Sequence, residues 1–394
     1  MPYLSVNLTN IADLFGSQMI DYYNISLLIL FCIFATATAV QIFYYLYFYL
    51  SVYLKEPQDG KKSNQPVSVI ICARNEAENL KNFLPSVLEQ DYPDFEVIVV
   101  NDCSEDNSYD ILAEYLKKYP NLRISTVNKD PKFSHNKKFA QFIGIKAAKN
   151  EILLFTDSDC RPESNKWLEE MTCHFEEKID FVLGYGGYMS EKGILNKYIR
   201  CDRLTIAMKY MGMAIRKVPY TGVGRNLSYR RSVFFANKGF GSHNHLVSGD
   251  DDLLVNTIAT GENTYVEARQ ETHTRSIAAS SINEWIAQKK RHLTTSPYYK
   301  PRDKFLLITE PFTRVLFYSA LVILLSFLYL WPWVLAVFVI RLITQITVFT
   351  LIRKKLNEPG LLAYLLIFDI FSPLINGIIF LSNNRIISGK NRWK

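Results

Sequence analysis

A stretch without a single charged residue, running from Tyr22 to Leu54, constrains the fold of this chain most strongly. Roughly 20 residues of helix cross the apolar core of a bilayer, and backbone placed there must satisfy its own hydrogen bonds. No Lys or Arg precedes the stretch, which is also too long for the apolar part of a signal peptide. We therefore expect residues 22–54 to form a transmembrane helix.

The charges around this stretch predict its orientation. Positive residues begin directly after it, at Lys55, Lys61 and Lys62, so the positive-inside rule places residues 1–21 outside and the following residues in the cytosol. A net charge of +7 without a dense Lys/Arg stripe argues against a nucleic-acid binder and suits contact with membrane lipids. The expected location is a bacterial inner membrane, with the domain that follows this helix on the cytosolic side.

After a polar linker at residues 55–65 the sequence changes to alternating strands and helices. Such alternation is typical of an α/β domain with a parallel sheet covered by helices on both faces. Residues 66–280 are assigned to this domain. The expected strands are 67–72, 96–100, 122–127, 152–156 and 180–185, and the expected helices are 77–89, 109–118, 137–149, 196–216 and 250–260.

Hydrophobic segments return in the last quarter of the chain. A capping-box pattern at Ser281 opens a helix to about His292, within an interfacial segment at 281–310. Residues 311–382 contain two expected membrane spans and a third segment interrupted by Pro373, which we expect to be re-entrant. Arg341, inside a span, is a functional candidate or a partner of Asp369. Residues 383–394 form a basic tail.

Two aspartates follow the apolar strand 152–156 directly. Asp157 and Asp159 are spaced i, i+2, so their side chains point to the same side of an extended chain. Ligands of α/β sheets sit beyond the carboxyl ends of the strands, and carboxylates suit Mg²⁺ or Mn²⁺. The alternative is a solvated turn.

Polar turns also follow the first two strands. Ala73-Arg74-Asn75-Glu76 ends the first, and Asp102 ends the second, where it could accept hydrogen bonds from a nucleoside or cap the next helix. The chain has neither G-x-G-x-x-G nor a phosphate loop, so a nicotinamide or ordinary NTPase site is not supported. No C-x-x-C pair points to zinc.

Further polar residues lie later in the domain. Asp250, Asp251 and Asp252 open a helix, where they could supply a general base or simply favour the helix dipole. Trp285, Gln288 and His292 share one face of the helix at 281–292, which could equally rest on a membrane surface. We expect Arg269, Arg275, His243 and His245 to be solvated loop residues.

Seven short motifs follow one another in this part of the chain. They are V-S-V-I-I-C-A-R-N-E at 67–76, V-I-V-V-N-D-C-S at 97–104, K-K-F-A-Q-F-I-G-I at 137–145, D-S-D at 157–159, T-G-V-G-R-N-L-S-Y-R-R at 221–231, G-D-D-D-L-L at 249–254 and Q-K-K-R-H at 288–292. Together they resemble the motifs of the family 2 glycosyltransferases. That resemblance implies inverting enzymes with the GT-A fold, a Rossmann-like fold that binds nucleotide-diphospho-sugars.

The resemblance implies a role for individual residues. Asp157 and Asp159 would hold the metal, Mg²⁺ or Mn²⁺. Asp251 matches the general base, and Asp250 replaces a glutamate beside it. Residues implied to bind the nucleotide-sugar are Ala73, Arg74, Asn75, Glu76, Asp102, Lys137, Asp157 and Ser158. Those implied on the acceptor or diphosphate side are Arg225, Asn226, Gln288, Arg291 and His292, the last standing where the family has tryptophan.

The implied activity is metal-dependent transfer of a hexosyl or N-acetylhexosaminyl group from a UDP-sugar. The acceptor is expected to be a lipid or another membrane-associated glycan, in a layout similar to ceramide glucosyltransferases. The small hydrophobic tail and His292 favour a lipid over the alternative, a processive polysaccharide synthase. An inactive membrane scaffold with this fold is the non-enzymatic alternative, against which the intact acidic motifs argue.

Overall fold

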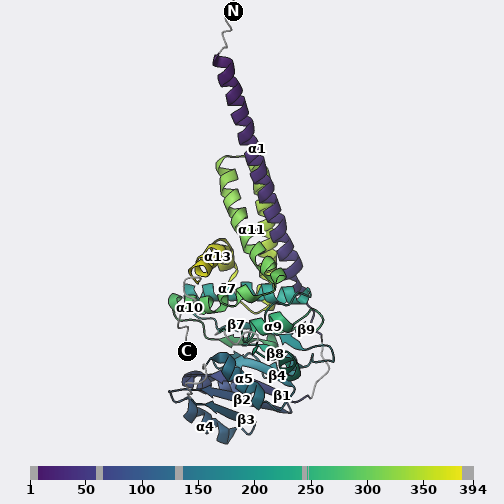
Figure 1. Cartoon of the computed structure of the whole chain (residues 1–394), viewed down its shortest axis with the longest axis vertical. Helices are drawn as coiled ribbons and strands as arrows, with labels where there is room; N and C mark the ends of the chain where they lie inside the picture. Colours follow the sequence, from purple (N-terminus) through teal and green to yellow (C-terminus); the bar gives the residue numbers. More distant parts are fainter. Residues whose placement is uncertain (1–7, 59–64, 129–135, 242–245, 247, 384–394) are drawn as a thin grey trace, which may run out of the picture.

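The computed structural model describes residues 8–58, 65–128, 136–241, 246 and 248–383. Lys61, Lys62, His243, His245 and the expected basic tail beyond residue 383 lie outside the described residues. Figure 1 shows a domain built on a sheet at one end and long helices extending away from it, with helices α7 and α10 lying between the two parts.

The main sheet has seven strands in the order β3-β2-β1-β4-β8-β6-β9. The first four strands in the chain are parallel, as the alternation of strands and helices predicts, but β8 runs antiparallel to both of its neighbours. A smaller sheet has the order β5-β10-β7. The strands are β1 Val67–Ala73, β2 Phe95–Asp102, β3 Leu122–Val127, β4 Ile152–Asp157, β5 Cys160–Pro162, β6 Phe181–Leu183, β7 Gly186–Tyr188, β8 Leu227–Arg230, β9 Thr264–Val266 and β10 Thr274–Ser276.

Both faces of the main sheet are buried along its central strands, which explains why β1 and β4 read as nearly continuous apolar runs. All seven residues of β1 are buried. Val69 and Ile71 belong to one hydrophobic cluster, while Ile70 and Cys72 belong to another on the opposite face. This alternation follows from the two-residue repeat of a strand. The helices of the domain are α3 Ala77–Leu88, α4 Ser108–Lys118, α5 Lys137–Ala147, α6 Trp167–Thr172, α7 Ile194–Ile215, α8 Arg231–Ala236, α9 Asp252–Ile258 and α10 Ile282–Leu293.

Among the described residues, four helices are long and apolar enough to cross a membrane. The first candidate span, Tyr22–Leu54, lies within a continuous run of α1 Leu8–Phe43, the π-helical segment η1 Tyr44–Tyr49 and α2 Leu50–Leu54. The others are α11 Pro301–Ser326, α12 Trp331–Lys355 and α13 Leu362–Asn383. Helix α11 begins at Pro301, so part of the connection expected at 281–310 is helical. Figure 1 shows that α13 stays near the base of the long helices rather than running along α1 and α11.

The membrane helices and the sheet domain share one core. The cluster that contains Ile70 also includes Phe48 of η1 and Phe349 of α12. Helix α7 lies against η1 so closely that a side-chain Cβ at Gly212 would come within 2.3 Å of the Phe48 carbonyl oxygen. Glycine permits this backbone approach because it carries no Cβ.

A buried charge network joins the membrane helices. Arg341 donates to an Asp369 carboxylate oxygen at 2.6 Å, which confirms the expected pairing. Arg314 donates to the other Asp369 oxygen at 3.0 Å and pairs with Glu310 at 2.9 Å. Since an unpaired charge in the hydrocarbon region is costly, these partners account for the presence of charged residues there.

The expected break at Pro373 is wrong, because α13 continues through it. Proline has no N–H, so the carbonyl of Asp369, four residues earlier, loses its normal helical partner. Arg314 donates to this carbonyl at 3.4 Å. A neighbouring side chain thus replaces the missing bond, as is common for proline in membrane helices.

Candidate active site

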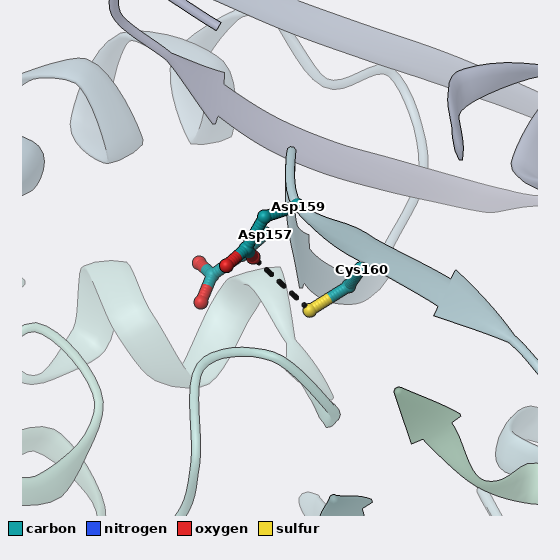
Figure 2. Close-up of side chains that lie close together, drawn as sticks. All are labelled: Asp157, Asp159 and Cys160. Atoms are coloured by element: carbon teal, nitrogen blue, oxygen red, sulfur yellow. Dashed lines mark hydrogen bonds between the residues drawn. The ribbon is translucent and has the colours of Figure 1, made fainter. Parts of the chain in front are cut away.

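Three possible metal ligands gather at the carboxyl end of β4. One ligand atom each from Asp157, Asp159 and Cys160 lies within 4.8 Å of the others (Figure 2). The Cys160 thiol donates to the Asp159 carboxylate at 3.4 Å. Cys160 begins β5 and is buried. The motif D-S-D pointed to the two carboxylates, but the third ligand becomes visible only when the turn into β5 is in place.

Lys137 lies against this cluster. As the first residue of α5 it is held by the cap of that helix, in which the Asn136 side chain accepts from the Phe139 N–H at 3.0 Å. Its ammonium group is 2.6 Å from Asp157 and 3.7 Å from Asp250. Lys137 thereby connects the strand end with the acidic start of α9.

The two carboxylates of the D-S-D motif differ in acidity. Burial would raise the pKa of Asp157, but the charges of Lys137 and Arg225 outweigh it and hold that pKa below its usual value. Burial and the charge of Asp157 raise the pKa of Asp159. A cation between them would relieve this repulsion, and two carboxylates suit Mg²⁺ or Mn²⁺. Burial raises the pKa of the Cys160 thiol, which makes it a poor ligand for these hard ions.

The three acids at the start of α9 have separate surroundings. Asp251 accepts the Asp252 N–H at 2.8 Å and the Gly224 N–H at 2.6 Å, which fixes its carboxylate against the wall of a cavity. Asp252 accepts from Tyr299 at 2.8 Å and from Thr295.

Burial raises the pKa of both Asp250 and Asp252. Burial raises the pKa of Asp250, although Lys137 opposes this rise. Burial and the neighbouring Asp251 raise the pKa of Asp252 to about 7. Of these three acids, Asp251 and Asp252 line the cavity, and the Asp252 carboxylate is occupied by Thr295 and Tyr299, so the carboxylate best placed to meet a bound molecule is that of Asp251.

The strand ends expected to bind a nucleotide lie along one edge of the sheet. Pairing places Ala73 beside Asn101, the residue before Asp102, and places Cys72 beside Asp157. Asp102 is fully buried at the end of β2, and Ser158 is buried in the turn after β4. The residues that the motifs predicted for one site therefore converge at this edge.

Hydrogen bonds join the two loops that leave this edge. The Asn75 N–H donates to Ser104 Oγ at 3.0 Å, and the Asn75 side chain accepts the Glu105 N–H at 2.8 Å. Asn75 has a left-handed backbone, with φ of 56°, in the turn that carries Arg74 and Glu76. A pocket of about 360 Å³ opens there, lined by Asn75 and Glu76 among others.

A larger cavity, of about 750 Å³, connects this edge with the membrane helices. Lys137, Asp157, Arg225 and Asp251 line its inner end, and Gln288, Arg291 and His292 of α10 line its wall. Its outer end is lined by residues of α11 and α13, including Phe312, Pro373, Asn376 and Phe380. The cavity therefore runs from the acidic cluster to the apolar helices.

Arg225 and Asn226 are neighbours with different surroundings. Arg225 lines the cavity, where it stacks over the Tyr188 ring at 4.6 Å and donates to the Tyr188 hydroxyl at 3.2 Å. Asn226 is fully buried; it accepts from Trp167 Nε1 at 3.0 Å and donates to the carbonyls of Tyr185 and Thr272. Asn226 does not face the cavity, in contrast to the role that the motif implied.

Two arginines expected to be solvated are paired with acids, so that expectation is wrong. Arg269 is bonded to Glu267 at 2.7 Å and also pairs with Glu170. Arg275 is buried and pairs with Glu358, in the connection between α12 and α13. Glu170 and Glu358 each lie more than 80 residues in sequence from the arginine that they pair with, so local patterns gave no signal for these two pairs.

Comparison with known proteins agrees with the geometry. Residues 68–235 match the profile of glycosyl transferase family 2. Glycosyltransferase AglE of Haloferax volcanii is 31% identical over 195 residues, which are 47% of this chain and 58% of AglE. The poly(ribitol-phosphate) beta-glucosyltransferase of Bacillus spizizenii is 36% identical over 247 residues, 61% of this chain and 35% of that enzyme. The chain thus spans between a third and three fifths of these relatives.

A solved structure resembles most of the chain. The mannosyltransferase PcManGT from Pyrobaculum calidifontis, in complex with GDP-Man and Mn²⁺, superposes with a TM-score of 0.57 at 17% identity. The match covers 87% of this chain and 99% of that one, which shows a common fold. The chain therefore has the GT-A fold, with a segment at residues 68–235 that matches glycosyl transferase family 2, and its described part includes four apolar helices long enough to span a membrane.

Proposed function

We propose that the protein transfers one sugar, with inversion, from a UDP-sugar to a hydroxyl group of a lipid acceptor. The observation that carries the proposal is the cavity that joins Asp157 and Asp251 to α11 and α13. A lipid lying in the membrane could place its head group at the acids while its chains stay against apolar helices. The outer wall, which includes Phe312 and Phe380, suits such chains.

The chemistry needs a base on the acceptor side and stabilisation on the donor side. The Asp251 carboxylate takes the proton of the acceptor hydroxyl, whose oxygen bonds to the anomeric carbon. The bond from that carbon to the diphosphate breaks, and its electron pair leaves with the nucleoside diphosphate. Lys137 and Arg225, at the same end of the cavity, stabilise the charge on the departing group. Asp250 supports the site by pairing with Lys137.

A divalent metal, Mg²⁺ or Mn²⁺, fits the ligand cluster of Asp157 and Asp159. When bound there, such an ion stabilises negative charge on a leaving diphosphate. We expect Asp159→Asn to lower the transfer rate by several powers of ten and to weaken Mn²⁺ binding, followed by electron paramagnetic resonance of the bound ion. Full turnover in EDTA, or Mn²⁺ binding unchanged by the substitution, would contradict this assignment.

Two other functions make different predictions. A processive polysaccharide synthase would release long products from a labelled donor, whereas single transfer yields one lipid that carries one added sugar. An inactive scaffold would neither transfer nor hydrolyse a UDP-sugar. Lipid extraction after incubation of the purified full chain with labelled UDP-hexoses and UDP-N-acetylhexosamines separates the three. The proposed location of the sheet domain is the cytosolic side, where UDP-sugars are available, because Lys55 follows the first span.

The base assignment is tested by neighbouring substitutions. Asp251→Asn should abolish transfer while UDP binding stays nearly unchanged, because the base acts on the acceptor. Asp252→Asn serves as the matched control: its carboxylate is occupied by Thr295 and Tyr299, so transfer should persist. If Asp252→Asn is inactive and Asp251→Asn is active, the base has been assigned to the wrong residue.

A further inference from the structure

Helix α13 lies along the side of the sheet domain. Near its start, Lys197 of α7 donates to the Tyr364 hydroxyl at 2.8 Å. One turn later the Phe368 ring packs against a tyrosine ring of α7, with the two centroids 5.0 Å apart. Near the end of α13, Ile379 belongs to a buried cluster that also contains Trp285 of α10. The contacts with α7 and α10 therefore extend over most of the length of α13.

These contacts differ from those of a helix that crosses a bilayer. From Tyr364 to Ile379 the helix rises by about 22 Å, whereas the apolar core of a bilayer is about 30 Å thick. Helices α7 and α10 carry several charged side chains and, in the described part of the chain, are not candidate membrane spans. A spanning helix would touch such helices at one of its ends, but α13 touches them along its side (Figure 1).

A second side of α13 is apolar and exposed. Six large apolar residues recur there with the spacing of one helix face, and each is at least 43% exposed. They are Ile367, Ile370, Phe371, Leu374, Ile378 and Leu381. The charged residue of α13, Asp369, is buried and paired with Arg314 and Arg341. The exposed face suits lipid chains, because a helix in the membrane surface sinks its apolar face about 5–10 Å into the lipid.

The third side of α13 lines the cavity, through Gly377 and Phe380 among others. On α11, Ile308 and Phe312 line the same cavity one turn apart, and they are 64% and 58% exposed. Side chains that line a cavity and are also exposed mark its mouth. The mouth therefore lies between α11 and α13, and its walls are mostly apolar.

Gly377 leaves this mouth wide. A Cβ added at Gly377 would meet no atom from other parts of the described chain within 4 Å, whereas a Cβ at Gly212 would meet the Phe48 carbonyl oxygen at 2.3 Å. Close packing therefore explains the glycine at position 212 but not the one at position 377. Because glycine inside a helix is unfavourable relative to alanine, the open space beside Gly377 points to a role in the cavity.

We infer that α13 lies in the surface of the bilayer, on the side of the sheet domain, and that the mouth beside Gly377 admits a hydrocarbon chain of the acceptor lipid. The inference rests on the proposed function and adds the route of the acceptor. The lipid enters sideways from the leaflet next to the sheet domain and does not cross the bilayer. Phe312 and Phe380 flank its chain, and the exposed face of α13 keeps the mouth at the level of the lipid chains.

A bulky side chain at the mouth tests the inference. Gly377→Trp fills the open space, and Ile378→Trp, its matched control, adds the same ring on the exposed face of α13. The full chain is placed in phosphatidylcholine nanodiscs that contain a diacylglycerol with a diazirine at the end of one chain. In wild-type protein, light should attach this lipid to Ile206 of α7 and Leu293 of α10, which line the cavity. Gly377→Trp should lower this labelling at least fivefold and the rate of sugar transfer to lipid at least tenfold, whereas Ile378→Trp should change neither.

Three outcomes would count against these proposals. Absence of label on Ile206 and Leu293 in wild-type protein overturns the inference without any variant, so misfolding of Gly377→Trp cannot obscure it. If Gly377→Trp removes the label while transfer continues at the wild-type rate, the lipid is structural and the inference is wrong. Absence of transfer to any lipid by wild-type protein overturns the proposed function, and the labelling still judges the mouth on its own.

The position of α13 has a test of its own. Ser382 lies at the end of α13, and Trp333 lies near the start of α12. In intact cells an impermeant maleimide should label Trp333→Cys above the wild-type background and should leave Ser382→Cys unlabelled until the cells are lysed. Label on both variants in intact cells would mean that α13 crosses the bilayer, which overturns the inference.

Discussion

Removal of the Glu358 carboxylate should destabilise the attachment of the last membrane helix to the sheet domain. Glu358 lies between α12 and α13, and its side chain is fully buried. It accepts from the Tyr185 hydroxyl at 2.8 Å, from Arg200 Nε at 2.9 Å and from Arg275. Both arginines are almost completely buried as well. One carboxylate therefore holds a loop of the membrane region on α7 and β10.

The size of the effect follows from what remains after the change. Glu358→Ala leaves two buried guanidinium groups without this partner, and breaking a buried pair in this way costs about 3–5 kcal/mol. An unfolding entropy of about 2.1 cal/mol/K per residue, taken over the whole chain, converts this loss into a fall in Tm of about 4–6 °C. Because α13 forms part of the cavity wall, the KM for a lipid acceptor should rise as well.

Glu163→Ala is the matched control, because Glu163 pairs with the same arginine. Its side chain is 25% exposed and lies 3.1 Å from Arg275 Nε. Since Arg275 keeps Glu358, the loss should stay below about 1 kcal/mol, or roughly 1 °C. Both Tm values are measured by differential scanning fluorimetry of the full chain in one detergent. Equal shifts for the two variants would refute the reasoning that burial decides the cost.

Two further predictions concern the α9 acid and the asparagine of the core. The pKa of Asp252 is about 7 in the folded protein and about 4 in the unfolded chain. Between these two values the folded state binds the extra proton. The free energy of unfolding should therefore fall as pH rises through this range, by at most about 1.4 kcal/mol per pH unit. Asp252→Asn should flatten that part of the Tm profile between pH 4.5 and 8, and identical slopes would argue against the raised pKa. Asn226→Ala should lower the free energy of unfolding by about 3 kcal/mol, because it removes three buried hydrogen bonds. The KM for the acceptor should stay unchanged when transfer kinetics are measured on the folded variant.

Strands buried on both faces were the easiest part of the fold to predict. The runs that form β1, β2 and β4 are mostly apolar, and each ends in or is followed by polar residues at one edge of the sheet. Short elements with mixed composition were missed. Strand β8, Leu227–Arg230, runs antiparallel at the centre of the sheet, yet its four residues read as part of a motif rather than as a strand.

The turn before β8 shows why a motif does not separate the roles of Arg225 and Asn226. Arg225 and Asn226 stand next to each other just before β8, and only Arg225 reaches the cavity. A motif names residues that occur together, but it does not separate those that contact a ligand from those that hold the backbone in place. The hydrogen bond that Trp167 donates to the Asn226 side chain shows that Asn226 holds the backbone in place.

Pro373 shows why the membrane wall of the cavity could not be predicted. In one dimension, a proline flanked by Asp369 and Asn376 resembles a break in a helix. In the structure, Arg314 of α11 binds the carbonyl that the proline leaves free, and it binds the carboxylate of the same aspartate. The arginine thus keeps α13 helical and holds it against α11. Pro373 and Arg314 both line the cavity, so the contact that repairs the helix also closes the wall along which an acceptor lipid would lie.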